Sequence, residues 1–164
     1  MGMQLPGELI TLLDLLGYTW PASDEEKLFE LGQAWIDFSS DIAGFVDAAG
    51  ASAAGVLNGN QGLDIDAFEQ WWSGEEGPLA SVLSNVDGSV IGGAGLIVAA
   101  AIVLALKIAV IVQLTILAIQ IAQAIATAAP TFGASLLEIP VFQTISRTIV
   151  GNLIQESVWR LLDG

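Results

Sequence analysis

The stretch LFELGQAWIDFSSDIAGF, residues 28–45, carries a large apolar side chain at every third or fourth position. This spacing keeps the apolar side chains on one side of an α-helix, while Glu30, Asp37 and Asp41 turn outward. We call the apolar set the heptad seam and predict that other helices of this chain, or a partner, bury it. The heptad seam comprises Leu28, Leu31, Trp35, Phe38, Ile42 and Phe45.

Capping residues, glycines and prolines set the ends of the predicted helices. Ser23 and Glu26 form a predicted capping box, in which the Ser23 hydroxyl accepts from the backbone and Glu26 reaches back. Gly17 is expected to end the first helix, and Asp87-Gly88 the fourth. The predicted helical segments are 5–16, 23–49, 64–72, 78–87, 90–129 and 134–164, the last one interrupted at Pro140.

No strand pattern is present in the sequence, so the predicted fold class is all-α. We expect an elongated helical bundle, built on a helical hairpin with a long apolar central helix. Ser89 and Gly93 have the spacing that lets two helices approach closely. Because they lie in a glycine-rich helix start, we interpret them as a flexible junction instead.

The central segment, residues 90–129, contains one charged residue, Lys107. The uncharged runs on its two sides are each near the length of roughly 20 residues that crosses a bilayer. Gln113, Gln120 and Thr127 nevertheless form a polar row with a spacing of seven. Such a row is typical of a bundle helix that is covered on most sides and wetted on one. We therefore predict a central bundle helix, with membrane insertion as the alternative.

The composition removes several classes of function. The chain has no histidine and no cysteine, and only four of its 164 residues are lysine or arginine. The usual general base near neutral pH, the common zinc ligands and thiol nucleophiles are therefore missing, so we expect no enzyme, no metal and no other cofactor. Of the 18 acidic residues, 15 lie in residues 1–90 with a single base, Lys27. Such an acidic surface repels phosphate backbones, which excludes nucleic acid as a partner.

Two tryptophans precede a turn in FEQWWSGEEGPL, residues 68–79. Adjacent residues on a helix point about 100° apart, so Trp71 and Trp72 cannot share one apolar face. We predict that Trp72 packs beneath a bend, where Gly74 takes a conformation that a side chain would resist. Trp71 is then the more exposed of the pair and a candidate for contact with a partner.

A series of short motifs runs through the whole chain in a characteristic order. Trp72-Ser73-Gly74 reads Trp-x-Gly; the other motifs are Leu5-Pro6-Gly7-Glu8-Leu9, Gly17, Trp20-Pro21, Asp24-Glu25-Glu26, Phe68-x-x-Trp71, the segment from Lys107 to Ile111, and Thr131-Phe132-Gly133-Ala134-Ser135. This order resembles the WXG-like N-terminal domains of actinobacterial polymorphic toxins. These domains are similar to the small Trp-x-Gly helical-hairpin proteins exported by type VII secretion.

The resemblance implies one helical domain over residues 1–164, with acidic amphipathic helices in 1–89 and an apolar helical part in 90–164. It implies a targeting and delivery role, in which the domain binds a small WXG-type helical protein or the export apparatus as a hetero-oligomer. Export then needs no signal peptide, and a C-terminal effector is expected outside this chain. The motif and turn residues are Trp20, Pro21, Trp72 and Gly74, and the candidates for the partner interface are Trp71 and the heptad seam. The rival hypothesis is a pore or translocation domain that inserts residues 90–129 into a membrane.

Overall fold

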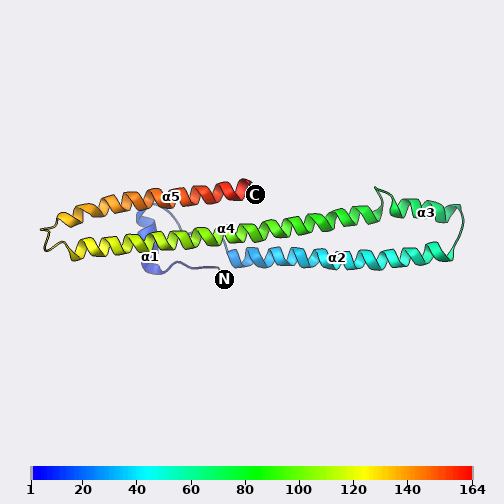
Figure 1. The fold of residues 1–164 in the computed structure, drawn as a ribbon. Coiled ribbons are helices and arrows are strands. Elements are labelled where there is room, and N and C mark those ends of the chain that lie inside the picture. The colour runs from blue at the N-terminus through cyan, green and yellow to red at the C-terminus, as the bar shows by residue number, and fades with distance from the viewer. Residues whose placement is uncertain (1, 164) are drawn as a thin grey trace. The chain divides into compact units, whose positions relative to one another are not determined.

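The computed structural model describes residues 2–163, and helices make up the fold of this range without any strand (Figure 1). The predicted all-α class, built on a helical hairpin with a long apolar helix, is confirmed. The elements in chain order are α1 (Gly7–Leu15), α2 (Glu25–Gly59), α3 (Leu63–Ser73), α4 (Pro78–Ala126), the short 3₁₀ helix η1 (Ala134–Glu138) and α5 (Ile139–Asp163).

The helices contribute to two compact units. The first unit contains residues 1–27 and 98–164, and the second contains residues 28–97. Each of the two long helices contributes residues to both units: the chain passes from the first unit to the second within α2 and back to the first within α4. Within the second unit, α2 and the first part of α4 run side by side in opposite directions, and α3 lies in the connection between them (Figure 1). This pair is the helical hairpin of the fold.

The hairpin of the second unit is closed by direct contact between two glycines. A Cβ atom added to Gly32 of α2 would lie 2.7 Å from the carbonyl oxygen of Gly93 in α4. The reciprocal Cβ on Gly93 would lie 2.7 Å from the carbonyl oxygen of Gly32. Ser89, one turn before Gly93, is also buried. The interpretation of Ser89 and Gly93 as a flexible junction is therefore wrong, because they form a close helix contact.

This contact determines which side of α2 faces α4. The most buried positions of α2 in the second unit are Gly32, Ser39 and Ala53, which are all small. Small residues let the two backbones approach, whereas the larger side chains of the heptad seam would hold the helices apart. The side of α2 that packs within the chain is therefore the one next to the heptad seam. The first of the two predicted alternatives, burial by the chain's own helices, does not hold for the whole heptad seam. Burial by a partner stays a prediction.

The core of the first unit is formed by α1, α4 and α5. Its buried side chains are Leu5, Leu13, Leu16, Val110, Leu114, Leu117 and Val150. Gly17 ends α1 with a left-handed φ of 81°, as predicted. The backbone N–H of Tyr18 donates to the carbonyl of Leu13, and that of Gly17 donates to the carbonyl of Asp14. These two bonds form a Schellman motif, which turns the chain sharply at the end of α1.

Four features of the helix boundaries differ from the sequence predictions. Helix α2 ends at Gly59, ten residues after the predicted end at Ala49. Helix α2 begins at Glu25, and the Asp24 carboxylate, not the Ser23 hydroxyl, accepts from the backbone N–H of Lys27 at 3.2 Å. Helix α4 continues through Asp87-Gly88 to Ala126, because packing at Gly93 outweighs the low helix propensity of the glycines. Pro140 lies in the first turn of α5 and does not interrupt it, since a first-turn proline needs no N–H partner.

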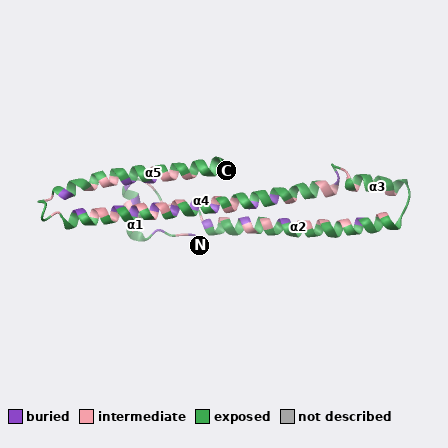
Figure 2. Ribbon diagram, in the orientation of Figure 1, coloured by how far each residue is buried: buried purple, intermediate pink, exposed green. Residues whose placement is uncertain are grey.

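The polar row on α4 is only partly exposed to solvent, since Thr127 is exposed but the two glutamines are not. The Gln113 side-chain amide donates to the buried Ser146 hydroxyl of α5 at 3.0 Å, and Gln120 is half-buried. Val112, Ile116 and Ile119 are exposed instead. Exposed positions recur along α4 (Figure 2). The prediction of a helix that is covered on most sides is therefore wrong within the described residues. A long apolar surface of α4 lacks cover from this chain.

The glycine contact predicts opposite effects for two Gly→Ala substitutions on α2. Gly32→Ala should lower the free energy of unfolding by about 2 kcal/mol, because the added methyl group forces the backbones of α2 and α4 apart. Gly44→Ala is the matched control, since a Cβ there meets no atom within 4 Å. It should raise stability by up to about 1 kcal/mol through helix propensity. The free energy of unfolding of both variants is measured by urea unfolding followed by circular dichroism. Equal effects of the two substitutions would contradict the close contact.

Candidate partner-binding surface

The heptad seam forms an exposed apolar ridge along α2 in the second unit. Leu31, Trp35, Phe38 and Phe45 are between 43% and 72% exposed. Leu28 and Ile42 are half-buried. The Trp35 and Phe38 rings meet edge to face, with centroids 6.3 Å apart and planes at 88°. Such an arrangement holds the two rings in place without burying them, so the ridge keeps a defined shape.

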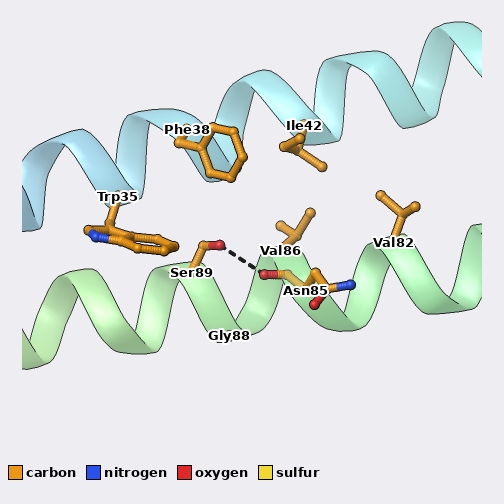
Figure 3. A pocket seen from close by; sticks show the side chains of 8 residues that line it. All are labelled: Trp35, Phe38, Ile42, Val82, Asn85, Val86, Gly88 and Ser89. Atoms are coloured by element: carbon orange, nitrogen blue, oxygen red, sulfur yellow. Dashed lines mark hydrogen bonds between the residues drawn. The ribbon is translucent and has the colours of Figure 1, made fainter.

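A groove lies beside this ridge, between α2 and α4 of the second unit (Figure 3). Its volume is about 500 Å³. The α2 wall consists of Trp35, Phe38 and Ile42, and the α4 wall consists of Val82, Asn85, Val86, Gly88 and Ser89. The Ser89 hydroxyl donates to the carbonyl of Asn85 at 2.9 Å, so this polar group is satisfied inside the helix. The groove therefore has an apolar aromatic wall opposite a wall of smaller side chains.

The Trp-x-Gly bend lies at the end of α3. Trp71 is 60% exposed, whereas Trp72 is half-buried and stacks on Phe68 with ring centroids 6.0 Å apart. The order of exposure is the predicted one, and contact of Trp71 with a partner stays a prediction. Gly74 has φ −66° and ψ 156°, an extended conformation that any residue adopts. The prediction of a special Gly74 backbone conformation is therefore wrong.

The space around the bend, not its dihedral angles, requires glycine. A Cβ on Gly74 would lie 2.8 Å from the carbonyl oxygen of Gln70. A Cβ on Gly77 would lie 2.5 Å from the carbonyl oxygen of Trp71 and 2.8 Å from that of Gly74. Sequence reasoning missed Gly77, although its place directly before Pro78 at the start of α4 marks it as a turn residue. The tight passage from α3 into α4 therefore depends on two glycines.

A second polar feature, the Lys107 clasp, lies in the first unit. Lys107 is only 2% exposed, and its ammonium group donates to the Glu25 carboxylate at 2.7 Å and to the Ser23 carbonyl at 2.6 Å. It also lies 5.7 Å from the centre of the Trp20 ring, in cation–π contact. The Trp20 indole N–H donates to the Met3 carbonyl at 3.3 Å. The clasp thus ties the N-terminal segment to the middle of α4.

The clasp explains one predicted motif residue, Trp20, and one residue that sequence reasoning left without a role, Lys107. Trp20 and Pro21 are half-buried, and Trp20 covers the ammonium group of Lys107. Lys107 is the single charge in a long apolar segment, a signal that could have identified it as a buried partner of an acid. Sequence alone does not reveal that this acid is Glu25.

The electrostatic balance of the clasp favours the ionised carboxylate. Burial raises the pKa of Glu25, but hydrogen bonds from the Lys107 ammonium group and the Met3 backbone N–H outweigh burial. The pKa of Glu25 therefore lies below its ordinary value of 4.5. Within the described residues, no cluster of three or more acidic side chains could hold a metal ion.

Comparison with known proteins places this arrangement in a family. The family described as WXG100 like domain matches residues 5–148. The chain belongs to the WXG100-like domain family. No curated protein and no solved structure matches it. Proteins of the WXG100 family typically form helical-hairpin dimers and are generally exported by type VII secretion systems.

The WXG100-like match covers the features described above. It contains the heptad seam, the groove, the Trp-x-Gly bend and, apart from Met3, the Lys107 clasp. In this WXG100-like chain the Trp-x-Gly motif lies at the end of the short helix α3, so most of α3 separates the motif from the end of α2. The hairpin of the second unit presents the heptad seam as its most exposed aromatic surface on α2.

The clasp predicts a stability loss that depends on pH. Glu25→Gln leaves the buried Lys107 ammonium group without its counter-charge and should lower the free energy of unfolding by about 3 kcal/mol at pH 7. Because the folded pKa of Glu25 is depressed, its contribution is complete above pH 4.5 and is lost as the pH falls through the folded value. The difference between wild type and variant should therefore narrow below pH 4.5.

The control for this prediction is Glu30→Gln, which changes the same charge at an exposed position of α2. The stability of wild type, Glu25→Gln and Glu30→Gln is measured between pH 3 and pH 7 by thermal unfolding followed by circular dichroism. The stability of Glu30→Gln should stay within about 0.5 kcal/mol of wild type. A Glu25→Gln deficit of the same size at every pH would show that the ion pair is not its source.

Proposed function

We propose that this chain is the N-terminal targeting and delivery domain of a secreted bacterial polymorphic toxin of the actinobacterial type. The domain binds a small WXG-type helical protein or the type VII export machinery, and the functional form is a hetero-oligomer. It leaves the bacterial cytoplasm without a signal peptide and carries a C-terminal effector. It has no enzymatic role and needs no cofactor.

The observation that supports this proposal most is the exposed heptad seam. Aromatic residues enriched at protein interfaces, here Trp35, Phe38 and Phe45, lie on the surface of a helix that has buried its small residues instead. A soluble monomer gains nothing in stability from exposing such a row, whereas a helical partner can cover it. Membership of the WXG100-like family makes a helical partner and type VII export the expectation.

Export of a reporter tests the proposal. The chain, fused in front of a reporter enzyme, should reach the medium of a bacterium that has a type VII system and should stay inside an otherwise identical strain that lacks the system. Trp35→Ala combined with Phe38→Ala should reduce the exported fraction about tenfold, because these rings are half-exposed anchors for a partner.

The matched control is Phe29→Ala, which removes an aromatic ring that is 49% exposed on the same helix and lies outside the heptad seam. It should leave export unchanged. Equal cellular amounts of all variants exclude a folding defect as the reason for reduced export. Release that is independent of the secretion system would contradict the proposed delivery role.

Membrane insertion of residues 90–129 is the second candidate function. One helical stretch, Leu63–Ala126, is long and apolar enough to cross a bilayer, with a mean hydropathy of 2.8 in its most apolar window and 22% of that window buried. The core helix of a soluble protein passes the same test of length and composition. The exposed Val112, Ile116 and Ile119 on α4 favour this candidate, because they leave an apolar surface that lipid could cover.

Dye release from liposomes tests this candidate. If the segment inserts, the chain should release dye from vesicles at pH 5 or pH 7, and Ile116→Asp should abolish release, because a charge on the lipid-facing side opposes insertion. Ser84→Asp, a charge of the same sign at an exposed position of α4 outside residues 90–129, is the comparison variant and should leave release unchanged. A chain that stays monodisperse without detergent and releases no dye rejects insertion.

A further inference from the structure

The second unit combines an apolar groove with charge of one sign. Residues 28–97 contain ten acidic residues and no lysine or arginine. All four basic residues of the chain lie in the first unit. The acidic residues of the second unit are Glu30, Asp37, Asp41, Asp47, Asp64, Asp66, Glu69, Glu75, Glu76 and Asp87. Any protein that docks on this unit therefore meets a surface without positive side chains.

Three of these acids are exposed on α2, and we call them the acidic row: Glu30, Asp37 and Asp41. Asp41 is three residues after Phe38 and four before Phe45, so its carboxylate is their neighbour on the helix surface. Glu30 is four residues before Ala34, which lines a shallow depression with Leu31, Trp35 and Phe38. The opposite border of the groove, on α4, is uncharged at Asn85 and Gly88.

This charge distribution disfavours two occupants of the groove. A second copy of the chain would bring a unit with the same ten acids and no base, and like charges at an interface lower affinity. An anionic lipid surface is repelled for the same reason. Both arguments concern the charges of the second unit around the groove. The groove itself has no charged lining residue and would accept any apolar helix of suitable shape.

We propose that the groove binds an apolar helix of another protein whose flanks carry lysine or arginine, and that this helix is not from a second copy of the chain. The proposal rests on the proposed function in one respect, that a helical partner exists, and it adds where the helix docks and what chemistry it carries. Trp35 and Phe38 provide the apolar contact area, and the acidic row selects the partner by charge.

The two parts of this surface have separable effects. Apolar contact in the groove provides most of the affinity, since aromatic side chains at the centre of an interface contribute the largest share. Exposed charges at the rim mainly speed association and exclude wrong partners. Because these charges are exposed, their contribution should decline as salt is added, whereas the apolar contribution should persist.

Two synthetic helical peptides of about 21 residues serve as probes, built on the same leucine heptad. One carries lysine at the flanking positions and the other carries glutamate. Binding of each peptide to the full chain is measured by titration calorimetry at two salt concentrations. The lysine peptide should bind at least about tenfold more tightly than the glutamate peptide, and this ratio should shrink as salt is added.

Three variants of the full chain locate the binding. The double variant Trp35→Ala with Phe38→Ala should bind the lysine peptide about tenfold more weakly. Neutralising the acidic row by Glu30→Gln, Asp37→Asn and Asp41→Asn should remove most of the preference for lysine over glutamate. The matched control neutralises three acids of α3, by Asp64→Asn, Asp66→Asn and Glu69→Gln, and should keep that preference. Circular dichroism checks that each variant remains helical.

Several results would overturn the proposal. Equal affinity for the two peptides would exclude selection by charge. If the α2 and α3 neutralised variants lost the preference for the lysine peptide equally, the preference would come from general attraction to an acidic protein. A dimer of the chain in sedimentation equilibrium that disappears in the Trp35 and Phe38 variant would make a second copy the occupant. Failure of export with intact peptide binding would reject the proposed function alone, and intact export without peptide binding would reject only this inference.

Discussion

The backbone contact between Gly32 and Gly93 is the constraint on which the surface of the second unit depends. With no side chain on either residue, α2 and α4 approach so closely that an added Cβ would lie 2.7 Å from the opposite carbonyl oxygen. That approach selects the small-residue side of α2 for packing within the chain. The neighbouring side, with Trp35 and Phe38, is then left at the surface and forms one wall of the groove. The interface candidate is thus a consequence of how the hairpin closes.

The first unit is held by a different kind of interaction. Its apolar core is closed over a buried ion pair, in which Lys107 contacts Glu25 and lies near the Trp20 ring. A buried ion pair is weak evidence for high stability, because desolvation of both charges offsets much of their attraction. The ion pair is better evidence for structural specificity. Lys107 is the single charge in residues 90–129, and the Glu25 carboxylate satisfies its ammonium group. The clasp therefore sets where the N-terminal segment lies along α4.

Together these features support the recognition role that we propose for this domain. Chemistry at neutral pH has few candidate groups in a chain without histidine or cysteine. What the described residues offer is exposed apolar surface: the heptad seam on α2 and a long side of α4. We propose that the heptad seam binds a protein helix with basic flanks. The exposed side of α4 is the surface on which the alternative of membrane insertion depends. The WXG100-like family is one whose members pair as helical hairpins, which agrees with the use we propose for the heptad seam.

The sequence by itself determined the helical class, most helix ends, the end of α1 at Gly17 and the absence of the usual catalytic groups. These follow from local physics: periodicity, capping and side-chain chemistry act within a few residues. Only the tertiary structure decided that small residues, not aromatic ones, close the hairpin, that Glu25 is the partner of Lys107, and that Gly77 is required at the bend. Each of these depends on the distance between segments far apart in sequence. A helical pattern identifies an apolar side but not which of two adjacent sides packs, because close backbone approach can outweigh the burial of larger side chains.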